Sequence, residues 1–222
     1  MSVAALIVAA GRGSRLGAEV PKQYLDLGGK AVLCRTIEAF LDVGAVSSVL
    51  VVIGEGDRNF YQKAVTELSD PRLTQPVIGG ATRAQSVRSG LEGLETGAPE
   101  KVLIHDAARP FVPRPVIEDV IDALDTVPGA FAALPVVDAL WQAEADMAKA
   151  PTSRENLWRA QTPQGFRFHD ILAAHRTGDE SALDDVEVAR AAGLDVRIVP
   201  GDEAAFKITT AQDLARARAM IS

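Results

Sequence analysis

The chain has 222 residues, a formal net charge of −7 at pH 7, three histidines and a single cysteine. The negative charge argues against a general binder of nucleic acid, because such proteins neutralise phosphates with clustered lysines and arginines. One cysteine rules out a disulfide within the chain and suits a reducing cytoplasm. Together with three histidines, it offers no ligand set for a structural zinc ion.

No apolar run reaches the roughly 18 residues that a membrane-spanning helix needs. No basic region precedes the first apolar run, so residues 1–10 are expected to form a strand and not a signal peptide. Stretches of helical period alternate with short apolar runs, which lie near residue 6 and at 49–53, 102–104, 130–137 and 196–199. This alternation predicts a single domain over residues 1–222, with a largely parallel sheet between two layers of helices.

The first apolar run, residues 5–10, is too short for a helix and predicts a strand buried on both faces. Gly11 and Gly13 follow, and glycines in a turn let backbone N–H groups approach phosphate oxygens. Pro21 restricts the same loop. The basic side chains of the loop are Arg12, Arg15 and Lys22. The pattern matches neither a Walker A loop nor a dinucleotide-binding motif, but it predicts a nucleoside triphosphate pocket. The alternative is an ordinary turn with exposed basic residues.

A second polar cluster begins at Gly79 and Gly80, which separate a short strand from an expected helix. One face of that helix carries Arg83, Ser86 and Gly90. We expect this face to close over a base and a ribose, because glycines let a flat ring approach and the serine hydroxyl offers hydrogen bonds. The alternative is a capped helix start with a solvated arginine.

A third cluster follows the apolar run 102–104, where Asp106 and Arg109 lie just past the carboxyl end of a strand. Open α/β sheets bind ligands at such ends. A buried carboxylate needs a partner, which we expect to be either a magnesium ion bridging triphosphate oxygens or Arg109 itself. A purely structural pair of these two residues is the alternative. His105 is expected to be a satisfied packing residue.

Residues 138–153 have weak periodicity, with Pro135 and Pro151 at their borders. We expect them to extend from the core as an arm, and such arms often pair with a second subunit and complete its site. Trp158, after the arm, is expected in the core or in an interface.

Near the end of the chain, Lys207 lies between Phe206 and Ile208 and is expected at the end of a strand. Thr209 and Gln212 are expected to form the capping box of the last helix.

Five motifs, in this order, resemble the 2-C-methyl-D-erythritol 4-phosphate cytidylyltransferase family of the non-mevalonate isoprenoid pathway, over nearly the whole chain. They are AAGRGSRLG with PKQYLDLGGK, GGATRAQSV, HDAARP, LWRAQTPQ and FKIT. The resemblance implies a three-layer α/β/α Rossmann-like nucleotidyltransferase fold, with a protruding β-arm at about 136–160 that builds a homodimer. It also implies a cytoplasmic enzyme that transfers the cytidylyl group of CTP to a small polyol phosphate, 2-C-methyl-D-erythritol 4-phosphate, giving the CDP-linked product and pyrophosphate. Mg²⁺ would be its cofactor, and neither nucleic acid nor a membrane would be a partner.

The resemblance also implies roles for individual residues. The triphosphate and ribose would be wrapped by Ala9, Ala10, Gly11 and Gly13. The cytosine pocket would be lined by Gly80, Arg83 and Ser86. Asp106 would sit near the metal and the ribose, with Ala107 and Arg109 beside it. The catalytic residues, which hold phosphates and stabilise the transition state, would be Arg15, Lys22 and Lys207. The acceptor would be bound by Arg109, Thr162, Lys207 and, from the partner's arm, Arg154.

Two positions depart from the family pattern on the acceptor side. Ala139 and Leu183 stand where members often have threonine. The CTP half keeps its pattern, so the alternatives concern mainly the acceptor. One is a pentitol phosphate such as ribitol 5-phosphate, and the other is a catalytically silent nucleotide-binding regulator.

Overall fold

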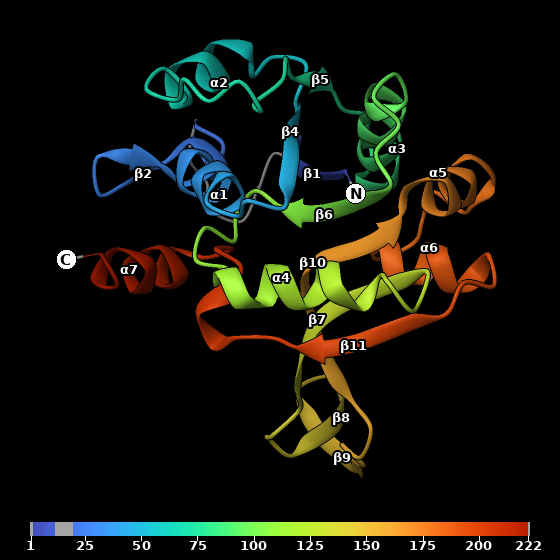
Figure 1. Ribbon diagram of the computed structural model, residues 1–222. Helices are drawn as coiled ribbons and strands as arrows, with labels where there is room; N and C mark the ends of the chain where they lie inside the picture. The colour runs from blue at the N-terminus through green and yellow to red at the C-terminus, as the bar shows by residue number, and fades with distance from the viewer. Residues whose placement is uncertain (1, 12–19, 222) are drawn as a thin grey trace.

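The computed structural model describes residues 2–11 and 20–221, and a seven-stranded sheet runs through it (Figure 1). Its strands are β1 (Val3–Ala9), β4 (Val46–Ile53), β5 (Val77–Ile78), β6 (Lys101–Asp106), β7 (Gly129–Pro135), β10 (Trp158–Arg167) and β11 (Val196–Pro200). Their order in space is β11-β7-β10-β6-β1-β4-β5. β10 is antiparallel to both neighbours, whereas the other adjacent strands are parallel. The expectation of a largely parallel sheet is therefore wrong at β10.

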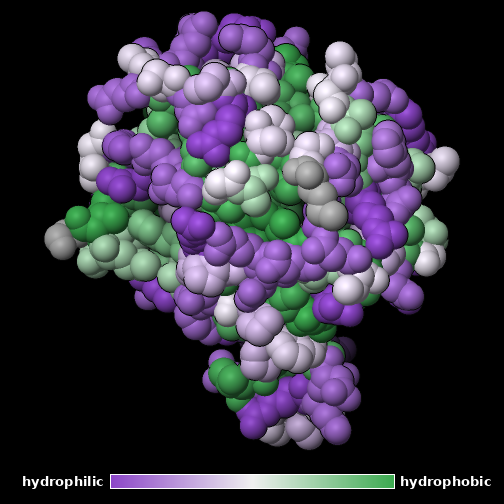
Figure 2. All heavy atoms as spheres, viewed as in Figure 1, coloured by the Kyte–Doolittle hydropathy of each residue, from purple (hydrophilic) through white to green (hydrophobic). Residues whose placement is uncertain are grey.

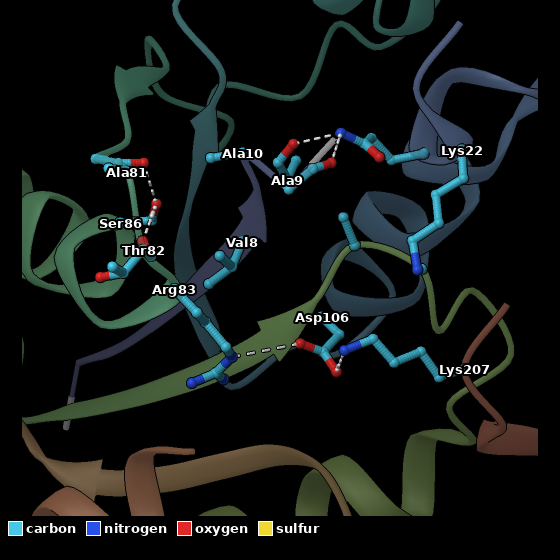
Figure 3. Close-up of a pocket in the computed structure, with 15 residues that line it drawn as sticks. Val8, Ala9, Ala10, Lys22, Ala81, Thr82, Arg83, Ser86, Asp106 and Lys207 are labelled. Carbon is cyan, nitrogen blue, oxygen red and sulfur yellow. Dashed lines mark hydrogen bonds and ion pairs between the residues drawn. The ribbon is translucent and has the colours of Figure 1, made fainter. Parts of the chain in front are cut away.

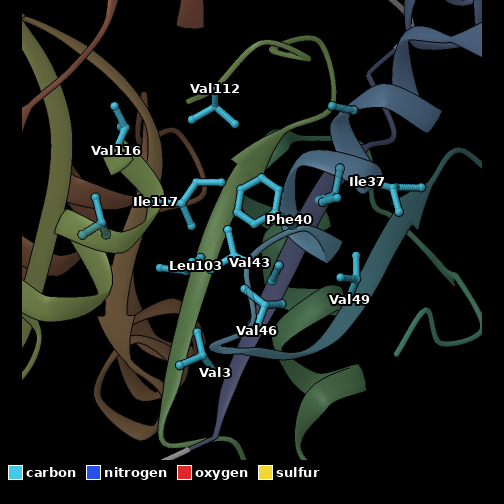
Figure 4. Packing of buried hydrophobic residues seen from close by; sticks show 14 of the residues in the cluster. Val3, Ile37, Phe40, Val43, Val46, Val49, Leu103, Val112, Val116 and Ile117 are labelled. Atoms are coloured by element: carbon cyan, nitrogen blue, oxygen red, sulfur yellow. The ribbon is translucent and has the colours of Figure 1, made fainter. Parts of the chain in front are cut away.

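Helices cover both faces of this sheet (Figure 1). One face carries α1 (Val32–Leu41), α2 (Arg58–Ala64) and α4 (Arg114–Ala123), and the other carries α3 (Arg83–Leu94), α5 (Phe168–Thr177) and α6 (Asp185–Ala191). On the first face Phe40 of α1, Ile117 of α4 and Leu103 of β6 pack together (Figure 4). On the second face Leu91 of α3 packs with Phe168 of α5. The predicted three-layer α/β/α fold is confirmed.

β1 is buried on both faces, as its short apolar sequence predicted. Its odd-numbered residues belong to the core under α1 and α4, while Ala4 and Leu6 belong to the core under α3 and α5. This alternation follows from the two-residue period of a strand. β1 therefore lies at the centre of the molecule and delivers the loop after it to one edge of the sheet.

A hairpin of β8 (Leu140–Glu144) and β9 (Met147–Thr152) projects from the body as the expected arm (Figure 1). Trp141 and Met147 on it are 60% and 68% exposed. The face of the arm seen in Figure 2 carries both hydrophobic and hydrophilic residues. Trp158 begins β10 and is 45% exposed, so it does not lie in the core. Its other expected place, in an interface, stays a prediction.

The C-terminal segment packs at the edge of the sheet where β6 ends. A small ladder of β2 (Asp26–Leu27) and β3 (Lys30–Ala31) lies beside α7 (Ala211–Ala219), and Leu27, Ile208 and Leu214 share a separate apolar cluster there. Lys207 follows the short helix η3 (Glu203–Ala205) in irregular backbone, so the strand expected for it is wrong.

The last helix begins one residue later than its expected capping box. Thr210, and not Thr209, is the N-cap of α7, and its side chain accepts a hydrogen bond from the backbone N–H of Asp213. The carboxylate of Asp213 in turn accepts a hydrogen bond from the backbone N–H of Thr210. Gln212 plays no part in this box. The two partners of the box are still three positions apart in the sequence, but both lie one residue later than predicted.

Cys34 lies in α1 and its side chain is buried, as predicted. Among residues 2–11 and 20–221, no helix combines the length and the apolar character needed to cross a membrane.

Candidate functional site

A cavity of about 270 Å³ opens at the edge of the sheet where β1, β5 and β6 end (Figure 3). This is the carboxyl end of parallel strands, where open α/β sheets bind ligands. The residues that line it are Val8, Ala9, Ala10, Gly11, Lys22, Gln23, Gly80, Ala81, Thr82, Arg83, Ser86, Asp106, Ala107, Ala108 and Lys207. The structure thus brings together every described residue that we assigned to nucleotide binding. Gly13 and Arg15 lie outside the described residues.

The loop after β1 is held in place by Gln23, which the sequence reasoning missed. Gln23 is 2% exposed, and its side-chain amide donates to the backbone carbonyls of Ala9 (2.5 Å) and Gly11 (3.1 Å). Gln23 belongs to the short helix η2 (Lys22–Tyr24), so the same turn fixes this loop and carries Lys22. Its position after Pro21 and Lys22 in the PKQ motif was the available signal.

Lys22 lines the cavity, as we predicted from its place in the loop that Pro21 restricts. Its ammonium donates to the carbonyl of Ile208 (2.9 Å), which joins the N-terminal loop to the C-terminal segment. In Figure 3 the side chain of Lys22 lies on the same side of Asp106 as Lys207.

The opposite wall of the cavity is the start of α3. Thr82 and Gln85 form a capping box, and the Ser86 hydroxyl donates to the carbonyl of Thr82 (2.9 Å). A Cβ on Gly79 would lie 2.7 Å from both Ala10 Cβ and Ser86 Oγ, so the close approach of this wall to the β1 loop requires glycine there.

One expectation for α3, and one part of its alternative, need correction. Gly90 does not share a ligand face with Ser86, because it packs in the core against Leu6 and Val52. Arg83 is not solvated either, because its guanidinium donates to Asp185 Oδ2 at 2.7 Å. The capped helix start, which was our alternative, is present, and it lines the cavity as well.

Asp106 lies where three cationic side chains meet. Its Oδ2 is 3.0 Å from Lys207 Nζ and 3.3 Å from Arg109 Nε, and its Oδ1 is 3.8 Å from Arg83 Nε. Arg83 and Lys207 approach from opposite sides (Figure 3). Burial by itself raises the pKa of Asp106, but the positive charges of Lys207, Arg83 and Arg109 outweigh burial and hold that pKa well below its usual range. The carboxyl is therefore ionised at neutral pH.

Arg83 is fixed by a buried acidic residue that the sequence reasoning did not assign. Asp185 is fully buried and also accepts from His175 Nε2 at 3.1 Å. Burial raises the pKa of Asp185, but the nearby Arg83 and the hydrogen bond from His175 lower it overall. The two aspartates hold Arg83 between the sheet and α6.

A second cavity, of about 170 Å³, adjoins the first. Its lining residues are Arg83, Asp106, Arg109, Ala160, Gln161, Thr162, Gln164, Leu183, Asp184 and Lys207. The two cavities share Arg83, Asp106 and Lys207. The structure thus places three residues assigned to the acceptor, Arg109, Thr162 and Lys207, in a compartment next to the nucleotide cavity.

The remaining acceptor-side residues lie elsewhere or at the rim. Arg154 follows the arm hairpin and lines neither of these two cavities. Ala139 is exposed at the base of the arm, and Leu183, 86% exposed, borders the second cavity. The roles assigned to these positions stay predictions.

His105 is a satisfied core residue, as expected. It is fully buried, its ring packs edge-on against Phe40, and both ring nitrogens have hydrogen-bond partners in Thr162 and Arg109.

The described residues provide no cage for a metal ion, since no three His, Cys, Asp or Glu side chains among them are grouped for one. Among the described residues that line the nucleotide cavity, Asp106 carries the one carboxylate. Its Oδ1 lies 3.8 Å from Arg83 Nε, which is beyond hydrogen-bond distance. A carboxylate in this place fits an Mg²⁺ ion that is bound mainly through substrate phosphates.

Known proteins match the chain over its whole length. It is 51% identical, over 221 residues, to a bifunctional enzyme IspD/IspF of Rhodobacter capsulatus. The match covers all of this chain, and the chain spans 56% of that relative's length. It is 47% identical over 222 residues to the 2-C-methyl-D-erythritol 4-phosphate cytidylyltransferase of Cereibacter sphaeroides, covering 98% of that relative.

Solved structures agree in fold. A crystal structure of a 4-diphosphocytidyl-2C-methyl-D-erythritol synthase superposes with a TM-score of 0.86 at 32% identity, over 100% of this chain and 99% of the other. The 2-C-methyl-D-erythritol 4-phosphate cytidylyltransferase of Thermus thermophilus gives 0.79 at 37% identity, over 99% and 98%. The family model described as IspD, 2-C-methyl-D-erythritol 4-phosphate cytidylyltransferase, matches residues 3–222. The chain therefore belongs to the 2-C-methyl-D-erythritol 4-phosphate cytidylyltransferase family, and the predicted resemblance and the nucleotidyltransferase class are confirmed.

Proposed function

We infer that this chain transfers the cytidylyl group of CTP to 2-C-methyl-D-erythritol 4-phosphate, giving the CDP-linked product and pyrophosphate, in non-mevalonate isoprenoid precursor biosynthesis. The observation that carries this inference is the pair of adjoining cavities that share Arg83, Asp106 and Lys207, in a chain of this family. Two ligands held in these cavities would meet beside the Lys207 ammonium.

The first cavity suits the nucleotide. Ala9, Ala10 and Gly11 offer backbone groups to the triphosphate and ribose, and the loop that carries them is fixed by Gln23. Gly80 and Ser86, on the opposite wall, leave room for a pyrimidine ring. Because this wall is built from short side chains and backbone, we expect it to prefer CTP to purine triphosphates.

The chemistry is an in-line attack of an acceptor phosphate oxygen on the α-phosphorus of CTP, with pyrophosphate as the leaving group. The acceptor is already anionic at neutral pH, so no protein nucleophile is needed. Two unit charges about 4 Å apart repel by about 4 kcal/mol at an effective dielectric of about 20. Lys22 and Lys207, with Arg15 beyond the described residues, are the cations that would offset this repulsion.

Lys207 is suited to act on both substrates. Its side chain is 38% exposed, it lines both cavities, and in the free protein Asp106 holds its ammonium at 3.0 Å. An ammonium placed in this way can contact an α-phosphate on one side and an acceptor phosphate on the other. Arg109, also bound to Asp106, lines the acceptor side alone.

We also propose that CTP binds together with Mg²⁺, for which Asp106 is the acidic residue among the described residues that line the nucleotide cavity. When bound, the ion supplies positive charge to the triphosphate oxygens. The protein's own part is to keep Asp106 ionised and fixed, through Lys207, Arg109 and Arg83.

A second acceptor class remains a candidate because the departures from the family pattern lie on the acceptor side. Leu183 puts an apolar side chain at the rim of the second cavity, where a threonine would offer a hydroxyl. A pentitol phosphate such as ribitol 5-phosphate is the competing acceptor.

We further propose a cytoplasmic homodimer in which Arg154 of one chain reaches the acceptor cavity of the other. Two observations support the dimer: Arg154 lines neither cavity of its own chain, and the arm exposes Trp141 and Met147. The free thiol of Cys34 suits a reducing compartment.

A pyrophosphate-release assay tests the function. The enzyme is incubated with Mg²⁺, one of CTP, UTP, ATP or GTP, and one of methylerythritol phosphate, ribitol 5-phosphate or glycerol 3-phosphate. We expect turnover with CTP and methylerythritol phosphate above every other pair. Turnover of ribitol 5-phosphate alone would move the assignment to the second acceptor, and equal use of ATP and CTP would contradict the cytidylyl assignment.

A further inference from the structure

His105 connects the two halves of the site without reaching either cavity. It is the residue before Asp106 in β6, it is fully buried, and its ring lies 4.7 Å from that of Phe40 in an edge-on contact. Its Nε2 lies 3.1 Å from the backbone carbonyl of Arg109, and its Nδ1 lies 3.0 Å from Thr162 Oγ1. Thr162 Oγ1 in turn accepts from the backbone N–H of Asp106 at 3.1 Å.

The direction of each hydrogen bond follows from the partners. A carbonyl oxygen can only accept, so Nε2 of His105 carries a proton and donates to Arg109. The ring is fully buried and its two nitrogens face an uncharged carbonyl and an uncharged hydroxyl, so the neutral form is favoured and Nδ1 is an acceptor. Nδ1 therefore receives the hydroxyl proton of Thr162. The result is one ordered chain, from the Asp106 N–H through Thr162 and His105 to the carbonyl of Arg109.

We propose that His105 is a positioning residue that fixes Thr162 and the backbone of Arg109 relative to Asp106, and that it sets the hydrogen-bond polarity of the acceptor cavity. The Thr162 hydroxyl gives its only proton to His105. It can therefore only accept a hydrogen bond from a ligand, so it suits a hydroxyl group of the acceptor and not a phosphate oxygen. The phosphate is left to Arg109 and Lys207. The catalytic part of this proposal rests on the proposed function.

The tautomer is tested by NMR of the ¹⁵N-histidine-labelled protein, independently of activity. His105→Phe identifies the signals of His105 among the three histidines. At pH 7.5 we expect a neutral ring protonated on Nε2, because this nitrogen faces a backbone carbonyl and Nδ1 faces a hydroxyl. A neutral ring protonated on Nδ1, or a doubly protonated ring, would overturn the proposal.

The positioning role is tested by steady-state kinetics and CTP titration on His105→Phe, Thr162→Val and the double variant. We expect each single variant to raise KM for the acceptor about tenfold and to change CTP affinity less than about twofold, as when a buried hydrogen-bonded group loses its partner. The double variant should be no worse than the more damaged single variant, because both break one chain. Additive losses, or equal losses of CTP binding, would overturn the proposal.

Two further variants separate positioning from general loss of stability. Phe40→Leu removes the ring that packs on His105 but leaves the hydrogen bonds, so it should lower Tm without raising KM for the acceptor. Thr162→Ser keeps the hydroxyl and should therefore raise KM for the acceptor less than Thr162→Val does. If Phe40→Leu raised KM as much as His105→Phe did, the effect would be one of packing. If the wild-type enzyme used no acceptor, the proposed function would fail, while the NMR test of His105 would still stand.

Discussion

Asp106 shows what can and cannot be predicted for a single residue. Its neighbour Arg109 is three positions away, and the sequence suggested that pair. Arg83 and Lys207 come from distant parts of the chain, and only the resemblance to a known family put them in the same site. Gln23 was missed because its place in the PKQ motif does not state that its amide is buried against the loop after β1. A residue's chemistry can be inferred from its type, but its long-range partners depend on the fold.

The first prediction concerns the two lysines that line the nucleotide cavity. Because their charges matter most when negative charge accumulates at the α-phosphorus, Lys22→Ala and Lys207→Ala should each lower kcat by about 100-fold, and more than they raise KM for CTP. Lys63→Ala in α2, exposed and outside this cavity, is the matched control and should keep wild-type kcat. If either cavity variant kept the wild-type kcat, the lysine it lacks would have no catalytic role.

The second prediction follows from the low pKa of Asp106. A carboxyl with a folded-state pKa below its ordinary value of 3.8 stabilises the fold above that value and loses this contribution as pH falls through the folded-state pKa. Lys207→Ala removes a charge that lowers the pKa. Its free energy of unfolding should therefore fall below wild type by a constant amount above about pH 5, and the difference should shrink only as the pH falls below 3.8 toward the folded-state pKa. Urea unfolding between pH 7 and pH 2 measures this, and a difference that is already lost well above pH 3.8 would argue against the ion pair.

At the scale of elements, the apolar runs identified the parallel strands but not β10. The sequence of β10 contains Gln161, Thr162 and Gln164, which are buried although they are polar. Each is satisfied across the fold: Gln161 bonds to the backbone of Asp202, and Gln164 to the start of α6. Hydrophobic periodicity cannot detect a strand whose inward side chains are polar. Nor does it state whether a strand is parallel or antiparallel to its neighbours.

The third prediction concerns how closely α3 approaches the sheet. A Cβ on Gly90 would overlap with Leu6 Cδ1 and lie 2.7 Å from Val52 Cγ2, both in central strands. Gly90→Ala should therefore destabilise the protein by about 1–3 kcal/mol, although alanine favours helix. In Gly93→Ala the new Cβ would lie 2.9 Å from Val77 Cγ1, on the short edge strand β5, which can shift. The free energy of unfolding, measured with a chemical denaturant, should be clearly lower for Gly90→Ala than for Gly93→Ala. The reverse order would contradict this view of the packing.

At the scale of the whole molecule, the arm and the two cavities are separate parts of one chain. The prolines and the weak periodicity of residues 138–153 predicted a projecting segment, and the hairpin β8–β9 is that segment. Which surface the arm contacts could not be predicted from periodicity, because it depends on a second chain. Arg154 lies after this hairpin and outside both cavities, so its proposed role requires a particular assembly.

The fourth prediction tests that assembly by mixing two inactive variants. If Arg154 of one chain completes the acceptor cavity of the other, Arg154→Ala and Lys207→Ala should each abolish most activity. A mixed dimer would then contain one site with both Arg154 and Lys207 intact, because those residues come from different chains. Unfolding and refolding the two variants together should restore roughly a quarter of wild-type activity, since half of the dimers are mixed and each has one intact site.

Each variant refolded alone is the control and should stay inactive. Sedimentation velocity establishes whether the refolded species are dimers. If Arg154 served the cavity of its own chain, every site in the mixture would lack one of the two residues and no activity would return. A fully active wild-type monomer would exclude the shared site on its own. Because the restored activity depends only on which chain supplies each residue, the experiment separates a catalytic role of the arm from a role in stability alone.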